Sequence, residues 1–211
     1  PTSPYAEKVS SYLVEVYMNT RSYDAALKSI DRIAKPSAQI LEAKQKILFQ
    51  LGTQSFANAD FEQALKYLNQ SIAIGQYNRQ TKADAYYWCG ESYYRLNRMV
   101  EAARDFNAYL QLTTQPNNEM YALANYNLGY IAFHRKDYTQ ASNYFQKYVQ
   151  LEKGENATAL ADAYNRIGDC HLHVRNFEEA KQYYSQAEQM NTSSGDYSFY
   201  QLALVSGLQK D

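Results

Sequence analysis

Apolar residues recur along this chain with the spacing of amphipathic helices. In the first predicted helix, which begins at Tyr5, they fall at i, i+3, i+4 and i+7: Val9, Tyr12, Leu13, Val16 and Tyr17. This spacing places them on one stripe of a helix. A polar turn over residues 19–22 follows, and a second apolar stripe over 23–33 predicts a partner helix. Pro36 marks the end of this first helical hairpin.

Four further hairpins and a final helix follow the same pattern. The predicted helix pairs are 38–57 with 61–74, 81–96 with 99–112, 119–135 with 138–151, and 158–174 with 177–190; the final helix begins near 196. Asn118 and Asn156 stand where they can cap the helices that follow. In the short turns inside the hairpins, Asp60, Asp137 and Asn176 are expected to cap the second helices.

The hairpins repeat at a nearly constant interval. An Ala lies three residues after an aromatic residue or Met, and these alanines are 38, 38, 39 and 39 residues apart: Ala26, Ala64, Ala102, Ala141 and Ala180. Twelve residues before each of the last four alanines stands a Gly: Gly52, Gly90, Gly129 and Gly168. Such a period predicts an all-α array of stacked hairpins. We expect each Gly to let two helices approach while a bulky neighbour fills the gap.

The predicted organisation is a single array over residues 1–211. Its repeats span about 4–35, 37–75, 79–113, 117–152 and 156–191, with a partial repeat over 196–211. Gly207 lies 39 residues after Gly168 and takes the small position of this sixth repeat.

The repeated residues resemble the tetratricopeptide repeat. The family pattern of Leu-Gly, an aromatic residue, Ala and Phe is matched by Leu128-Gly129, Tyr138, Ala141 and Phe145. The resemblance covers essentially the whole chain and implies a right-handed α-α superhelix. The period exceeds the ~34 residues of the family, and we expect the extra residues to lengthen each first helix by about one turn. Repeats of this length look like those of bacterial cell-envelope assembly proteins, which implies a bacterial protein on the periplasmic side of the envelope.

The resemblance also implies a concave groove lined by the first helix of each repeat. The groove positions carried over onto this chain are listed by repeat: Phe49, Thr53 and Phe56; Tyr87, Glu91, Tyr94 and Arg95; Tyr126, Tyr130, Phe133 and His134; Asn165, Asp169, Leu172 and His173. One interpretation is an aromatic recognition groove, in which the tyrosines anchor a partner and Asn165 binds its backbone. The alternative is that these aromatic side chains pack against the neighbouring repeat.

Binding of a protein or peptide partner, as a scaffold or adaptor, is the function that this resemblance implies. The alternative is a ligand-sensing or regulatory module of a larger signalling or transcription-regulating protein. The Lys, Asn and Arg set with which chaperone-binding members hold a C-terminal carboxylate is not matched here.

Composition narrows the classes of partner. The net charge is -1 with 20% charged residues, so we expect no nucleic-acid partner. No apolar run reaches the ~18–20 residues that a bilayer crossing needs. The two cysteines, Cys89 and Cys170, lie two repeats apart, too far for a disulfide, and are expected to be buried thiols. The chain starts at Pro1 rather than Met, which we interpret as a processed or excised segment.

Catalytic chemistry is not expected, and no cofactor is predicted. The chain carries no phosphate-binding Gly loop, HExxH or GxSxG motif. The segment Asp169-Cys170-His171-Leu172-His173 has metal-ligating residue types, but helical geometry points His171 away from Cys170 and His173. A three-ligand metal site is therefore not predicted here.

The final helix is apolar nearly all round, with Tyr197, Phe199, Tyr200, Leu204 and Leu208 among its residues. A terminal helix of a repeat array needs a polar outer face for solubility. We expect that the natural protein continues past Asp211 or that helix 196–209 pairs with another chain.

Overall fold

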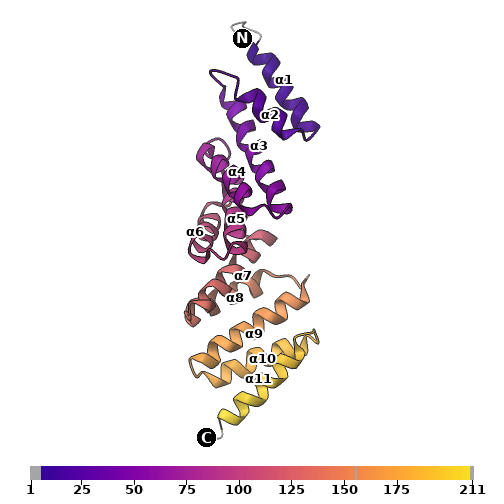
Figure 1. Ribbon diagram of the computed structural model, residues 1–211. Coiled ribbons are helices and arrows are strands. Elements are labelled where there is room, and N and C mark those ends of the chain that lie inside the picture. The colour runs from indigo at the N-terminus through magenta and orange to yellow at the C-terminus, as the bar shows by residue number, and fades with distance from the viewer. Residues whose placement is uncertain (1–5, 155, 210–211) are drawn as a thin grey trace. The chain divides into compact units, whose positions relative to one another are not determined.

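The computed structural model describes residues 6–154 and 156–209, and these residues form eleven helices and no strands (Figure 1). The helices are α1 (Ala6–Asn19), α2 (Tyr23–Ile30), α3 (Ala38–Ala57), α4 (Phe61–Ile74), α5 (Arg79–Arg95), α6 (Met99–Leu112), α7 (Glu119–His134), α8 (Tyr138–Leu151), α9 (Ala157–His173), α10 (Phe177–Gln189) and α11 (Gly195–Leu208). The predicted all-α fold is confirmed, with helix ends within three residues of prediction. The predicted helix start at Tyr5 lies outside the described residues.

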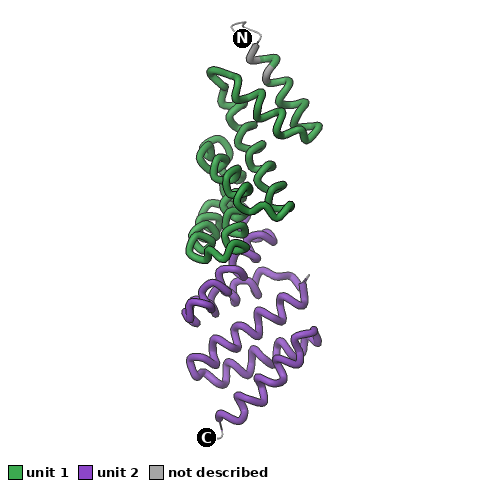
Figure 2. The backbone as a smooth tube through the Cα atoms, viewed as in Figure 1, with its two compact units in different colours: residues 1–114 green, residues 115–211 purple. Residues whose placement is uncertain are grey.

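The chain divides into two compact units, residues 1–114 and 115–211 (Figure 2). The boundary falls in the loop before Pro116. Within each unit, the principal packing contacts join helices that are adjacent or one apart in sequence, such as α3 with α4, α4 with α5, and α8 with α9. This is the packing of stacked hairpins, in which each repeat touches its neighbours. From α3 onward the first helices have 16–20 residues and the second helices 13–14, so the first helices are the longer ones, as expected.

Each repeat glycine from Gly52 to Gly168 lies where the two helices of its hairpin cross. A Cβ built on Gly90 would lie 2.7 Å from the ring of Phe106, and one on Gly129 would lie 2.8 Å from the ring of Phe145. Both rings are fully buried. Real Cβ atoms do not approach carbon atoms this closely, so only Gly permits this crossing. The predicted steric role of these glycines is confirmed.

The turns within the hairpins share a left-handed residue. Ala59, Asn97, Lys136 and Arg175 have φ between 58° and 61°, a conformation that costs non-glycine residues energy. The caps that follow differ from one another. Asp60 and Asp137 accept hydrogen bonds from the backbone N–H groups of Gln63 and Gln140, as predicted. The prediction for Asn176 is wrong, because its side chain makes no capping hydrogen bond.

The first hairpin departs from the others. Its second helix, α2, ends at Ile30 rather than at the predicted Ile33 and is only 8 residues long. In α1 the buried residue is Val14. Of the predicted apolar stripe, Tyr17 is half-buried against the core, whereas Val9, Tyr12, Leu13 and Val16 are exposed. These four are exposed because, in the described residues of unit 1, α1 packs only against α2 and α3 on its other side.

Candidate interaction surface

Unit 1 buries much of its predicted groove. Tyr87 is only 4% exposed, and its ring lies 5.4 Å from that of Tyr109 and 5.8 Å from that of Phe106. Glu91 is also buried, and it accepts a hydrogen bond from the Tyr87 hydroxyl at 3.3 Å. Tyr87 and Glu91 therefore lie in the interior, where Phe106 and Tyr109 of α6 pack against the Tyr87 ring.

The remaining groove positions of unit 1 are partly accessible. Phe49, Thr53, Phe56 and Tyr94 are half-buried, and Arg95 is exposed. The Phe56 ring packs edge-on against Phe61 and Trp88, with centroids 5.3 and 4.9 Å away. Phe56 therefore packs both within its own hairpin and against the neighbouring repeat.

Unit 2 leaves more of its predicted positions accessible. His134 and His173 are exposed, whereas Tyr126, Tyr130, Phe133 and Leu172 are half-buried. Asn165 is buried, and its amide oxygen accepts a hydrogen bond from the Ser198 hydroxyl at 2.9 Å, so this oxygen is already engaged within the protein. Asp169 is also buried. Leu172 packs against the apolar cluster around Tyr184 and Val205.

Aromatic rings join α7 to the start of α8 and the end of α9. The His173 ring stacks on Tyr138 at 4.2 Å with an interplanar angle of 6° and lies 6.0 Å from Phe133. Phe133 in turn lies 5.5 Å from Tyr138. Along α7, Tyr130 lies 6.4 Å from His134. We call these five residues, Tyr130, Phe133, His134, Tyr138 and His173, the α7–α9 aromatic face.

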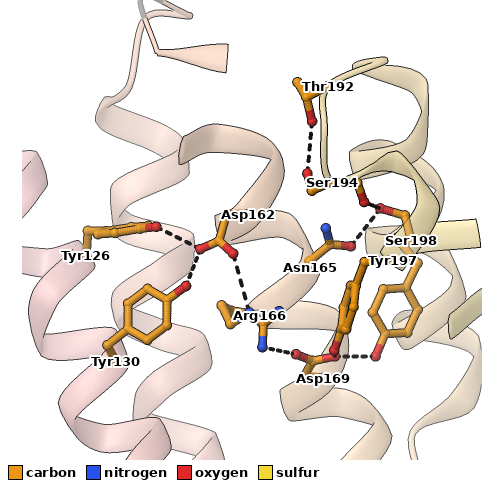
Figure 3. A network of polar contacts seen from close by, with 11 residues as sticks. Tyr126, Tyr130, Asp162, Asn165, Arg166, Asp169, Thr192, Ser194, Tyr197 and Ser198 are labelled. Atoms are coloured by element: carbon orange, nitrogen blue, oxygen red, sulfur yellow. Dashed lines mark hydrogen bonds and ion pairs between the residues drawn. The ribbon is translucent and has the colours of Figure 1, made fainter. Parts of the chain in front are cut away.

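A polar network, which includes Tyr130 of this face, joins α7 to α9 and α11 (Figure 3). Tyr126 and Tyr130 on α7 both donate hydrogen bonds to the same carboxylate oxygen of Asp162 on α9. The Arg166 guanidinium lies between two carboxylates, 2.7 Å from Asp169 Oδ2 and 3.6 Å from Asp162 Oδ1. The network thus fixes α7 against α9.

The network continues from Asp169 to the last two helices. Its Oδ1 accepts hydrogen bonds from the hydroxyls of Tyr184 on α10 and Tyr197 on α11, each at 2.7 Å. Asp169 is 5% exposed, and this burial raises the pKa of its carboxyl group even though Arg166 and the two tyrosines act in the opposite direction. Burial likewise raises the pKa of Tyr197 to about 12, so its hydroxyl remains a donor at neutral pH.

Sequence reasoning missed Asp162 and Arg166. A signal was present, because Tyr126 and Tyr130 are one helical turn apart, and Asp162 follows them by 36 and 32 residues, close to one repeat. In a stacked array, residues about one repeat apart lie on adjacent first helices.

Near the end of α9, four residues of metal-ligating types each contact different neighbours. Cys170 lies in the apolar core beside α8, and burial raises the pKa of its thiol to about 12. His171 stacks on Tyr183 at 5.4 Å, and His173 stacks on Tyr138. Asp169 faces Arg166. Within residues 6–154 and 156–209, no three His, Cys, Asp or Glu side chains form a group that could hold a metal ion.

Two family models described as the tetratricopeptide repeat match residues 49–119 and 120–193. The chain belongs to the tetratricopeptide repeat family. The matched segments run from within α3 to the loop before α11, and they contain the four repeat glycines at the helix crossings. A comparison with curated protein sequences finds no significant match.

Several solved structures share the fold. The crystal structure of MamA protein has a TM-score of 0.60 and 18% identity, over 92% of this chain and 97% of that one. BtubC from P. vanneervenii has a TM-score of 0.61 and 17% identity, over 90% and 83% of the two chains. YrrB, described as a TPR protein with an unusual peptide-binding site, has a TM-score of 0.60 and 15% identity, over 94% and 89%.

The family assignment carries a general function. Tetratricopeptide repeats are protein–protein interaction scaffolds, and the family is typically non-enzymatic. The described helices include none with the length and hydropathy of a membrane span.

Proposed function

We propose that this protein is a scaffold that binds a segment of a partner protein on the α7–α9 aromatic face. The observation that supports the proposal is the joined set of rings there: Phe133, Tyr138 and His173 lie within 6.0 Å of one another across two repeats. Two residues of the face, His134 and His173, are exposed to solvent. Aromatic side chains of this kind are the usual anchors of protein interfaces.

The polar network holds the side chains of the α7–α9 aromatic face in place before a partner binds. Tyr130 belongs both to the face and to the network, through its hydrogen bond to Asp162. The Arg166 guanidinium lies 5.9 Å from the centre of the Phe133 ring and is held by two carboxylates. A surface whose side chains are already ordered loses less conformational entropy on binding.

The side chains of the α7–α9 aromatic face also indicate which side chains the partner segment should carry. Phe133 and Tyr138 offer apolar ring surface to an apolar or aromatic side chain. The imidazoles of His134 and His173 can donate or accept hydrogen bonds at the rim. A peptide partner is in keeping with the YrrB description, which concerns a protein of the same fold.

Selection from a random-peptide phage library on the full chain tests the proposal. Binding of the enriched peptides to purified variants is then measured by fluorescence anisotropy. His134→Ala and His173→Ala should each weaken binding by about 5–30-fold, the range of an interface anchor. Val100→Ala is the control, because Val100 is exposed and lies on α6 of unit 1, outside the α7–α9 aromatic face. Peptides that bind both histidine variants as tightly as the wild type would overturn the proposal.

The ligand-sensing or regulatory alternative remains a prediction. It requires an effector domain beyond the residues of this chain, and a full-length gene sequence tests that requirement.

A further inference from the structure

Exposed apolar side chains gather on two helices of this protein. Among the described residues, ten large apolar side chains are exposed, and eight of them lie on α1 and α11. On α1 they are Val9, Tyr12, Leu13 and Val16; on α11 they are Phe199, Tyr200, Leu204 and Leu208. Each of these eight is between 40% and 66% exposed. Soluble proteins scatter such residues singly, and their concentration on two helices marks interaction surfaces.

The two surfaces have the form of helix-packing faces. On α1, Val9 with Leu13 and Tyr12 with Val16 are two i, i+4 rows. On α11, Tyr200, Leu204 and Leu208 form one such row beside the exposed Phe199. Rows at this spacing are the ridges with which helices in globular proteins interdigitate. Beside the α1 face, a cleft of about 500 Å³ opens between α1 and α3, and Tyr12 forms part of its lining.

We propose that α11 of one copy of this protein packs against α1 of a second copy, so that the copies associate head to tail. Each contact of this kind buries the α11 face of one copy and the α1 face of the next copy, so a single type of contact removes both apolar surfaces from water. Pairing of α11 with another α11 would cover only one of them and would leave the α1 face in water. A contact between two different patches is heterologous. Such contacts leave one free face at each end of the assembly, so further copies can bind until a ring closes.

Area and charge support a second copy as the occupant. A large aromatic side chain buries roughly 150–250 Å², and Phe199 and Tyr200 are 66% and 64% exposed. These two side chains alone therefore offer about a quarter to two fifths of the ~800 Å² that each partner contributes to a standard interface. The exposed row of α11 contains no charged residue, and Asp196 at its start is the sole charge in the helix. The cleft next to the α1 face is lined by one residue of each charge, Lys8 and Glu15, so its net charge does not oppose the docking of this nearly uncharged helix.

Two variants that each block one face give a sharp test. Val9→Glu/Val16→Glu places two charges on the α1 face, and Phe199→Glu/Tyr200→Glu places two on the α11 face. Because all four side chains are more than half exposed, the fold should survive, which circular dichroism verifies. Val100→Glu/Val174→Glu, at the two exposed apolar residues outside both faces, is the control with the same change in charge.

Sedimentation velocity of the full chain up to about 100 μM, a range that detects weak association, provides the readout. We expect the mean mass of the wild type and of the control to rise with concentration beyond that of a dimer. Each blocked variant alone should be monomeric, and an equimolar mixture of the two should form a one-to-one dimer through the remaining intact faces. A monomeric wild type at this concentration would overturn the proposal. So would dimers formed by the α1-blocked variant alone, because they would show that α11 pairs with itself.

Discussion

The helix crossing at Gly129 offers a quantitative test of the repeat packing. In Gly129→Ala, the new Cβ would lie 2.8–2.9 Å from three atoms of the Phe145 ring. Ordinary carbon contacts are about 3.5–4.0 Å, so the ring must move by roughly 0.6–1.2 Å. Phe145 is fully buried, and the rings of Tyr126 and Tyr130 lie 5.8 and 5.2 Å from it. We therefore expect the full overpacking cost of about 1–3 kcal/mol.

Gly207→Ala is the matched comparison. Gly207 also lies within a helix, but a Cβ there would meet no atom within 4 Å. Replacing Gly by Ala in a helix stabilises it by about 0.8–1 kcal/mol at either site, so the difference between the two variants isolates the steric cost. For a chain of this size that difference corresponds to roughly 2–12 °C in melting temperature. Thermal unfolding followed by circular dichroism, at low protein concentration, measures it. If Gly129→Ala melted as high as Gly207→Ala, the close crossing of α7 and α8 would be refuted.

Three further outcomes follow from turns, caps and burial. Lys136→Gly should raise the free energy of unfolding in urea by about 1 kcal/mol, because φ is 61° there, whereas Asn97→Gly should gain less, because Asn tolerates this conformation better. Asp137→Ala removes a capping hydrogen bond and should lower the free energy of unfolding by about 0.5–2 kcal/mol, whereas Asn176→Ala removes none and should change it little. Urea unfolding measures both. The pKa of Asp169 is raised in the folded state, so the folded state binds this proton more tightly than the unfolded state does. Ionisation of Asp169 therefore lowers the free energy of unfolding, increasingly so as pH rises from about 4 through the folded pKa. Melting curves across that range should therefore show a pH dependence that Asp169→Asn reduces; equal profiles would contradict this.

The helices and their register could be predicted from the sequence because the repeat imposes them. Gly129 and Phe145 recur at the same separation as Gly90 and Phe106, and a steric pair of this kind depends only on the two helices of one hairpin. The spacing of residues within one hairpin is therefore enough to predict the helices and the glycine crossing.

The accessibility of the groove residues could not be predicted in the same way. Tyr87 and Tyr126 hold equivalent places, each three residues before its repeat glycine, yet Tyr87 is buried and Tyr126 is half-buried. Both rings pack on the corresponding pair of the second helix, Tyr87 on Phe106 and Tyr109 and Tyr126 on Phe145 and Tyr148, so contacts within the hairpin do not decide their exposure. The apolar stripe of α1 likewise predicts a helix correctly, but burial depends on which neighbours pack against it.

The most direct measurement of the central claim is the mapping of a selected peptide onto the protein by NMR. Titration of the peptide into isotope-labelled full chain should shift the resonances of Phe133, His134, Tyr138 and His173 most strongly. Residues on the outer sides of α8 and α10, such as Gln140 and Gln182, should remain unchanged. Shifts confined to those outer sides, with the resonances of the α7–α9 aromatic face unmoved, would contradict the account.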